Sequence, residues 1–377
     1  MQDEHAITQA LIQQINQWVA IESPSHDAHA LHKMAAHIQK DAQRLGLTVQ
    51  ALPLHPDTGP ALHIHNRTTD QQDKGILVLG HYDTVHPVGT LTKNPCRQEG
   101  DKLYGPGSYD MKAGICLALY GLSQAMRQGG TALPVDILLL PDEETGSHYS
   151  RPTIEQFAAN AHYALVAEPA RANGGRCVTA RKGTGTIHLT THGQASHAGI
   201  AHEQGHNAIE EMAHQILALQ NMTDYKRGIT VSVGTIQGGT TSNVVPDFCT
   251  IEADFRIVDQ DSAQHLQNQV HALRSINPKV TLDIQFELNR PAMPRTAATV
   301  ALLEQCQGFA QQAGWSLQEA PRTGGASDAN FTAALGVPTL DGLGADGDGA
   351  HTLHEHILIS TLARRAQFWL YTLMHLR

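Results

Sequence analysis

The sequence contains few cysteines, and their positions exclude two common structural roles. The five cysteines are scattered along the chain, their number is odd, and no CxxC pair occurs. This pattern excludes a zinc knuckle and predicts reduced thiols in a reducing compartment. We therefore expect a cytoplasmic protein without a disulfide framework.

Long apolar runs and clusters of basic residues are also missing. No apolar stretch reaches the ~18 residues of a membrane span, and the N-terminal segment lacks the basic start and apolar centre of a signal peptide. A formal net charge of -10 without a long Lys/Arg run argues against a phosphate-binding surface. We expect no contact with membranes or nucleic acids.

The 377 residues exceed what one hydrophobic core usually serves, so two domains are expected. Apolar strand-like segments alternate with helical ones, which indicates an α/β layer with parallel strands. The first half is predicted to contain two helices before residue 46, strands at 48–52, 61–65, 75–80, 135–140 and 163–167, and helices at 110–127 and 154–161. The same texture returns after residue 290, with helices at 299–313 and 360–376 and a strand at 337–340.

The pattern between these two parts is different. From about residue 174 the strands alternate polar and apolar residues, as half-exposed strands do. The predicted order is strand 184–191, helix 207–220, strands 229–236 and 250–257, helix 261–274 and strand 280–287. This β-α-β-β-α-β order is the ferredoxin-like pattern, so we expect a small α+β domain inserted into the first.

Charged or imidazole side chains follow the ends of buried strands at three places. They belong to His81-Tyr82-Asp83, Asp110-Met111-Lys112 and Asp142-Glu143-Glu144. Burying such groups costs several kcal/mol unless they are paired or bound to a cation. The three clusters therefore predict a shared metal site at the carboxyl ends of the strands.

Each cluster also has a simpler interpretation. His81 is a metal ligand whose ring Asp83 orients, or the two are an unrelated histidine and a turn aspartate. Asp110 bridges two cations, or it caps the helix that follows. Glu168 follows a further buried strand and is a ligand or a loop residue. A late histidine is needed as well, and the sequence GAHTLHEHI offers His351, His354 and His356.

Taken together, the motifs GHYDTV, GPGSYDMKAG, LPDEETGS, AEP, GQASHAG and GAHTLHE resemble one family in their order and spacing. It is the family of di-zinc amidohydrolases and peptidases that includes carboxypeptidase G, acetylornithine deacetylase, succinyl-diaminopimelate desuccinylase and the aminoacylases. The resemblance implies a phosphorylase/hydrolase-like α/β catalytic domain with a mixed, largely parallel sheet between helices. It places this domain at residues 1–177 and 289–377, and a dimerisation or lid domain at 178–288.

The resemblance also implies two Zn²⁺ ions per subunit, although Co²⁺ or Mn²⁺ suits such a carboxylate-rich site as well. One zinc is held by His81 and Glu168 and the other by Glu144 and His351, while Asp110 bridges them and precedes a cis peptide bond. Glu143 is the implied general base, which takes a proton from a zinc-activated water.

Further resemblances lie in the inserted domain and after it. His197 is similar to a histidine that reaches a partner subunit's active site, which implies a homodimer. Asn243, Arg256 or Arg290 resemble residues near a substrate carboxylate, and Gly325 resembles part of a pocket-lining loop. A loop histidine, surface salt bridges and an ordinary turn are the alternatives for these residues.

The implied reaction is hydrolysis of an amide bond next to a free carboxylate in a small peptide or N-acyl amino acid. The carboxypeptidase G-like branch, which removes a C-terminal acidic residue, is favoured because AEP and TGGASDANFTAALG resemble it. The alternative is an N-acyl-amino-acid deacylase such as acetylornithine deacetylase or succinyl-diaminopimelate desuccinylase. A non-catalytic relative would have lost a ligand or the base, and none of these residues is missing.

Overall fold

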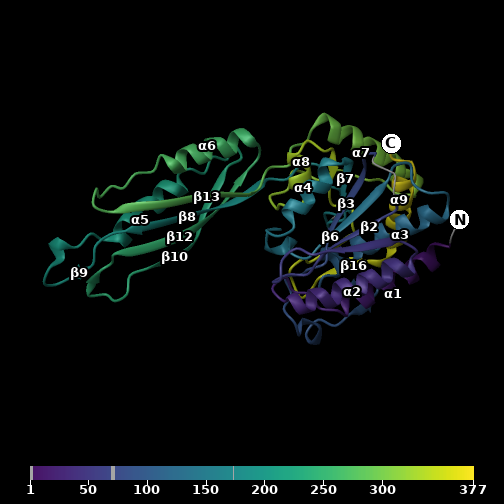
Figure 1. Cartoon of the computed structure of the whole chain (residues 1–377), viewed down its shortest axis with the longest axis horizontal. Helices are drawn as coiled ribbons and strands as arrows, with labels where there is room; N and C mark the ends of the chain where they lie inside the picture. The colour runs from purple at the N-terminus through teal and green to yellow at the C-terminus, as the bar shows by residue number, and fades with distance from the viewer. Residues whose placement is uncertain (1–2, 69–72, 173) are drawn as a thin grey trace. The chain divides into compact units, whose positions relative to one another are not determined.

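The computed structural model describes residues 3–68, 73–172 and 174–377, and the chain divides into two compact units (Figure 1). The first unit consists of Met1–Ala180, Arg295–Thr323 and Ser327–Arg377, and the second of Arg181–Pro294 with Gly324–Ala326. We call the second the inserted unit. Its assignment as a dimerisation or lid domain stays a prediction.

The first unit is built on a mixed six-stranded sheet. Its order is β1-β2-β6-β3-β7-β14, where β6, β3, β7 and β14 are parallel and β1 and β2 add an antiparallel edge. The strands are β1 (Thr48–Leu52), β2 (Ala61–His65), β3 (Gly75–His81), β6 (Val135–Leu140), β7 (Ala161–Val166) and β14 (Thr339–Leu340). Every residue of β3 and β6 is buried, as expected for parallel strands covered on both faces. The predicted α/β class with a largely parallel sheet is confirmed.

Helices pack around this sheet (Figure 1). They are α1 (Glu4–Val19), α2 (Ala28–Arg44), α3 (Ala113–Arg127), α4 (Arg151–Ala159), α7 (Ala297–Gln312), α8 (Ala329–Ala334) and α9 (Leu362–His375). Asp27 caps α2 by accepting the N–H of Ala30. Helices α3 and α9 approach closely because Gly121 leaves no side chain in the way, and a Cβ there would lie 2.6 Å from Cβ of Trp369.

A second, antiparallel sheet in the first unit consists of very short strands. Its order is β15-β16-β5-β4, with β4 (Arg97–Glu99), β5 (Lys102–Tyr104), β15 (Gly347–Asp348) and β16 (His356–Leu358). Residue His356 pairs with Tyr104, so the segment that follows His351 is fixed to the segment that precedes Asp110. The sequence patterns did not predict this sheet.

The inserted unit has the predicted ferredoxin-like order. Two helices accompany its antiparallel sheet β10-β12-β8-β13. Two further short strands, β9 and β11, pair with each other as a separate two-stranded sheet. The elements are β8 (Gly183–His192), β9 (Ser196–His197), α5 (Ala208–Gln220), β10 (Thr230–Gly238), β11 (Val244–Val245), β12 (Phe248–Ile257), α6 (Gln260–His271) and β13 (Thr281–Arg290). Burial alternates along β8, whose apolar face forms a separate core with α5 and α6.

One predicted helix begins at a different residue, and the difference affects the site. We expected a helix from Asp110 onward, but α3 begins at Ala113. Residues Ser108–Lys112 form an irregular turn in which Asp110 (φ -113°, ψ 94°) and Met111 (φ -134°, ψ 30°) are not helical. The N-cap interpretation of Asp110 is therefore wrong, since Lys112 occupies that position. The Asp110–Met111 bond is cis, as the resemblance implied.

After His351 come a turn and strand β16, which was not predicted, and then α9, which begins at Leu362, close to the predicted start at residue 360. Within the described residues, no helix is both long enough and apolar enough to cross a membrane.

Candidate metal centre

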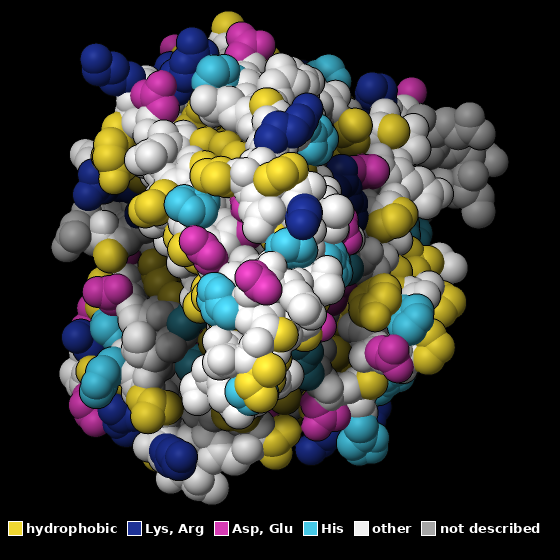
Figure 2. All heavy atoms as spheres, turned by 90° about the vertical axis from the view of Figure 1, so that its left-hand side faces the viewer, with side chains coloured by type: hydrophobic (Ala, Val, Ile, Leu, Met, Phe, Trp, Pro, Cys, Tyr) yellow, Lys and Arg dark blue, Asp and Glu magenta, His cyan; other side chains and the backbone are white. Residues whose placement is uncertain are grey.

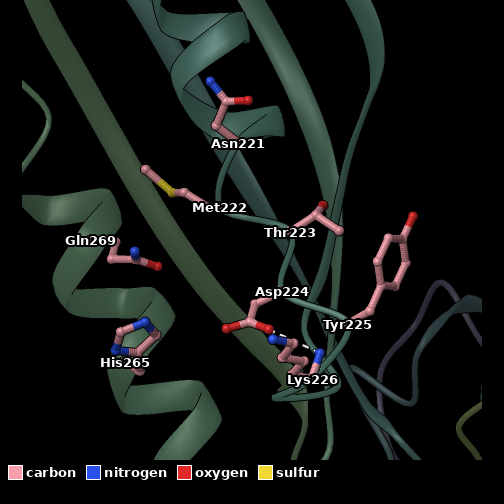
Figure 3. Close-up of a pocket in the computed structure, with 8 residues that line it drawn as sticks. All are labelled: Asn221, Met222, Thr223, Asp224, Tyr225, Lys226, His265 and Gln269. Carbon is pink, nitrogen blue, oxygen red and sulfur yellow. Dashed lines mark hydrogen bonds between the residues drawn. The ribbon is translucent and has the colours of Figure 1, made fainter.

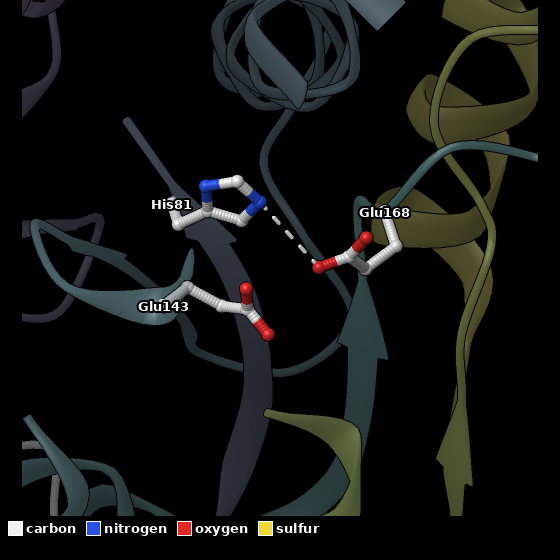
Figure 4. A group of neighbouring side chains, drawn as sticks. All are labelled: His81, Glu143 and Glu168. Carbon is white, nitrogen blue, oxygen red and sulfur yellow. Dashed lines mark ion pairs between the residues drawn. The ribbon is translucent and has the colours of Figure 1, made fainter. Parts of the chain in front are cut away.

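Three neighbouring parallel strands bring charged side chains to one edge of the sheet. Strand β3 lies between β6 and β7, and the three end at the same edge. His81 is the last residue of β3, Glu143 follows β6, and Glu168 follows β7. One ligand atom of each lies within 4.8 Å of the others, and the carboxylate of Glu168 points toward the imidazole ring while that of Glu143 lies beside them (Figure 4).

The Asp110 carboxylate lies between two histidines. Its Oδ1 is 3.2 Å from Nε2 of His81, and its Oδ2 is 3.2 Å from Nε2 of His351. Each imidazole also faces one further carboxylate: His81 lies 3.6 Å from Oε1 of Glu168, and His351 lies 3.3 Å from Oε2 of Glu144. Each histidine therefore faces two carboxylates, and the Asp110 carboxylate belongs to both groups.

The other two late histidines lie elsewhere. Nδ1 of His356 is 2.8 Å from the carbonyl oxygen of His354, and its ring contacts Tyr104. His351 has a positive φ of 63°, which is uncommon outside glycine and directs this residue toward Asp110 and Glu144. The structure thus brings together all five predicted ligands, His81, Asp110, Glu144, Glu168 and His351.

The Asp83 carboxylate contacts groups at two of these strand ends. Its Oδ1 lies 3.3 Å from Nδ1 of His81, whose Nε2 faces the other ligands. The same carboxylate accepts the backbone N–H groups of Glu143 (3.3 Å) and Glu144 (3.1 Å) and the hydroxyl of Ser25 (2.7 Å). Asp83 therefore fixes the ring of His81 and the turn that carries both glutamates.

The cluster concentrates negative charge in a buried place. Burial, together with the charges of Asp110 and Glu143, raises the pKa of Glu168 well above its usual value. Burial opposes ionisation of Asp110 too, but hydrogen bonds from His351 and His81 hold its pKa below its usual value. Hydrogen bonds to Asp110 and Glu144 raise the pKa of His351 to about 10.

These residues fit a pair of divalent cations. Asp110, Glu143, Glu144 and Glu168 carry a formal charge of four minus, which two divalent ions would balance. Oε1 of Glu144 is buried and has no hydrogen-bond partner among the described residues, a costly state for a carboxylate that coordination would relieve. Imidazole and carboxylate ligands suit zinc, cobalt or manganese.

The predicted residues of the inserted unit lie in two places within it. His197 of β9 and Asn243, directly before the paired strand β11, lie side by side, whereas Arg256 and Arg290 flank Thr184 of β8. His197 is exposed in β9 and pairs with Val244 of β11, while the Asn243 carbonyl accepts the N–H of Ala198. Arg256 pairs with Asp254 on its own strand, at 2.8 Å, and donates to the carbonyl of Gly324. Arg256 thus already has a carboxylate partner within its own strand.

Arg290 and Gly325 have partners that the sequence did not indicate. Arg290 is buried at the end of β13, and its Nη1 donates to Oδ1 of Asn289 at 3.4 Å. The carbonyl of Gly325 accepts from Nη1 of Arg181 at 2.9 Å. Arg181 is buried, and the sequence patterns did not single it out, because a single arginine before a strand has no distinguishing pattern.

A residue of the metal centre was also missed. Glu355 is buried beside the turn that carries Asp110, with His86 as a neighbour. Glu355 lies four residues after His351, and no sequence pattern indicated a role for it.

Among the described residues, no further group of three or more His, Cys, Asp or Glu side chains could hold a metal ion. A pocket of about 400 Å³ in the inserted unit is lined by Asp224, Lys226 and neighbours, where Asp224 accepts the backbone N–H of Lys226 at 2.9 Å (Figure 3). On the face drawn in Figure 2, basic, acidic, histidine and hydrophobic side chains are interspersed. No single charge sign dominates that face.

Comparison with known sequences agrees with this geometry. The profile of Peptidase family M20/M25/M40 matches residues 77–375. Carboxypeptidase G2 of Pseudomonas sp. (strain RS-16) is 30% identical over 366 residues, which cover 94% of this chain and 86% of that protein. Succinyl-diaminopimelate desuccinylase of Hydrogenovibrio crunogenus is 26% identical over 325 residues, covering 80% and 83%.

Solved structures are similar in fold. The crystal structure of aminopeptidase PepT from Bacillus cereus has a TM-score of 0.74 at 20% identity, covering 97% of this chain and 98% of that one. That of an M20 family metallo-carboxypeptidase from Sulfolobus solfataricus has a TM-score of 0.73 at 16% identity, covering 99% of each chain.

Proposed function

This chain belongs to peptidase family M20/M25/M40, and we propose that it hydrolyses an amide bond next to a free carboxylate with two metal ions in the centre around Asp110. Membership makes it a metallopeptidase that acts on peptides or acyl amino acids. The number of metal ions, their identity and the substrate are proposals that go beyond family membership.

The observation that carries the proposal is the position of Asp110. One carboxylate whose two oxygens face two different imidazoles, at 3.2 Å each, is the arrangement that a bridging ligand requires. His81 and Glu168 would hold one ion, and His351 and Glu144 the other. We infer zinc as the resident metal, with cobalt or manganese as substitutes.

Bound ions in such a site lower the pKa of a water and stabilise negative charge that develops on the substrate oxygen. The protein's own acid–base group is then Glu143, which lies next to His81 and Glu168 without being needed as a ligand. Its carboxylate takes a proton from water and later passes it to the leaving amine. Asp83 keeps the ring of His81 and the backbone of Glu143 in place.

The carboxypeptidase G-like reaction is our first choice for the substrate. It is supported by the 30% identity to carboxypeptidase G2 over most of the chain. Arg256 or Arg290, with Asn243 and Gly325, would recognise the free carboxylate, for which a guanidinium is well suited. The alternative is desuccinylase-like deacylation, supported by the 26% identity to a succinyl-diaminopimelate desuccinylase.

We further propose that the inserted unit forms a homodimer in which His197 serves the partner's active site. Strand β10 is an edge strand, and the unit exposes apolar side chains at Ile209, Leu217, Ile236 and Phe248. Edges and apolar surfaces of this kind pair with other chains. Sedimentation of H197A should show an unchanged dimer, and an activity assay should show that hydrolysis is lost. A wild-type protein that is fully active as a monomer would refute this role.

Two measurements test the proposal. Metal analysis of the purified chain should give two ions per chain, and D110N should retain fewer and lose at least ~100-fold in kcat/KM, because even residues that only orient ligands cost 10–100-fold. A substrate panel with saturating zinc should show hydrolysis of acyl-glutamates. Activity on N-acetylornithine or succinyl-diaminopimelate alone would reverse the choice of substrate.

A further inference from the structure

Glu355 is a fully buried carboxylate with four contacts in one small region. Its Oε1 accepts the backbone N–H groups of Tyr109 and Asp110, both at 2.9 Å. Its Oε2 accepts the N–H of Gly107 at 2.8 Å and lies 2.8 Å from Nε2 of His86. Hydrogen bonds to an ionised acceptor are about twice as strong as neutral ones, so this set holds its donors firmly.

Two of the three backbone donors, Tyr109 and Asp110, belong to the irregular turn that carries Asp110, and the third, Gly107, directly precedes this turn. Gly107 has a positive φ of 71°, and Asp110 and Met111 have non-helical angles, so a regular pattern of helical hydrogen bonds does not form there. Buried N–H groups without an acceptor would destabilise this conformation. Glu355 supplies the acceptors for these N–H groups. It thereby fixes the backbone conformation that sets the direction of the Asp110 side chain.

Glu355 also lies on the segment that carries His351. The side chain of His351 contacts Oδ2 of Asp110, and four residues later Glu355 accepts the N–H of the same aspartate. The carbonyl of Glu355 accepts the N–H of Gly105 at 3.2 Å, directly before β16 pairs with β5. One segment therefore contacts Asp110 on both its carboxylate and its backbone.

We propose that Glu355 is a positioning residue that sets the Asp110 carboxylate between the two metal positions and thereby determines metal affinity. The inference rests on the proposed function, because it assumes that Asp110 bridges two ions. His86 contributes by contacting Oε2 of Glu355, the oxygen that does not accept the N–H of Asp110. Without Glu355 the turn would adopt other conformations, and Asp110 would no longer contact both imidazoles at once.

The test compares E355Q with a matched control. Glu211, in the inserted unit, is equally a buried carboxylate that accepts backbone N–H groups, from Ile276 at 3.0 Å and Asn277 at 2.8 Å. An amide cannot accept on both sides, so E355Q and E211Q should both lower Tm. Only E355Q should weaken Zn²⁺ binding, by ~10–100-fold in competition with a chelator, as observed for residues that orient metal ligands.

Two results decide the question. If E355Q binds zinc as tightly as the wild type while its Tm falls as in E211Q, then Glu355 serves stability alone and the inference is overturned. If E355Q does not fold, H86Q removes only one of the four contacts, and it should still weaken zinc binding more than E211Q does; equal binding in H86Q and E211Q overturns the inference too.

The proposed function fails separately from this inference. A wild-type chain that binds no zinc, or one ion alone, contradicts the two-metal centre itself. A wild-type chain that binds two ions, with E355Q binding two ions equally tightly, contradicts only the role of Glu355. Zinc titration of the wild type therefore precedes the comparison of variants.

Discussion

The backbone N–H of Glu144 donates to Oδ2 of Asp83 at 3.1 Å, and this bond joins the ends of two neighbouring strands. Asp83 follows β3, whereas Glu144 follows β6, and the other oxygen of Asp83 faces the ring of His81. A single carboxylate thus fixes ligands that come from two strands. We therefore expect the proposed metal centre to depend on Asp83, although its carboxylate faces His81 and the backbone of the glutamate turn.

Replacing Asp83 by asparagine tests that dependence. D83N keeps one acceptor oxygen but loses the charge and one acceptor, so His81 and the glutamate turn are held less firmly. We expect ~10–100-fold lower metal affinity or kcat/KM. S25A, which removes one donor to the same carboxylate, should show a smaller loss in both assays. Wild-type values in D83N would refute the positioning role.

Replacing Glu143 by glutamine should separate catalysis from metal binding. A general base contributes ~10²–10⁴-fold, so kcat of E143Q should fall within that range while the metal content stays at the wild-type value. E155Q, on helix α4, is the control and should be fully active. Loss of metal together with activity in E143Q would instead make Glu143 a ligand, since its carboxylate lies close to His81 and Glu168.

Two helical glycines should respond in opposite directions to alanine. A Cβ at Gly114 would lie 2.0 Å from the carbonyl oxygen of Ala167, directly before Glu168, whereas nothing lies within 4 Å of a Cβ at Gly308. G114A should lower the free energy of unfolding by at least ~1–3 kcal/mol and weaken metal binding. G308A should raise it by up to ~1 kcal/mol, as urea denaturation would show. Equal stability of the two variants would contradict the close contact.

Asp136 should give a measurable acid dependence of stability. Burial raises the pKa of this carboxyl, but His63 and Arg67, at 2.9 and 2.7 Å, hold it below its usual value. A lowered folded pKa stabilises the protein above about pH 4, and this contribution is lost as the pH falls through the folded value.

D136N should therefore be less stable than the wild type by about 1–3 kcal/mol at pH 7. Urea denaturation between pH 7 and pH 3 should show this difference shrinking below about pH 4. A difference that stays constant over this range would mean that the Asp136 charge does not stabilise the fold.

Much of the fold was predictable because the strands that carry the site are unusually apolar. Strands β3 and β6 are buried on both faces, so their sequences stand out and end abruptly at charged residues. The parallel arrangement then places those ends at one edge, which brings His81, Glu143 and Glu168 together without further information. In the inserted unit, alternation along each strand was equally informative.

Other features have no local pattern. An aspartate shortly after a Gly-Pro-Gly segment looks like a helix cap, and nothing in the sequence reveals the non-helical angles of Asp110. Strands β15 and β16 contain only two and three residues, too few for alternation to be seen. The choice of His351 among three histidines came from the resemblance, and Glu355 was missed because its donors are backbone atoms of a segment far away in sequence.

The position of His351 also affects when the protein becomes active during its synthesis. His81, Asp110, Glu143, Glu144 and Glu168 all leave the ribosome before the inserted unit, and His351 follows it. A nascent chain that has folded strands β1 to β7 thus has most of the centre but lacks His351 and Glu355. Hydrolysis would begin only after the last segment of the first unit, Ser327–Arg377, has been synthesised and has folded onto the rest of that unit.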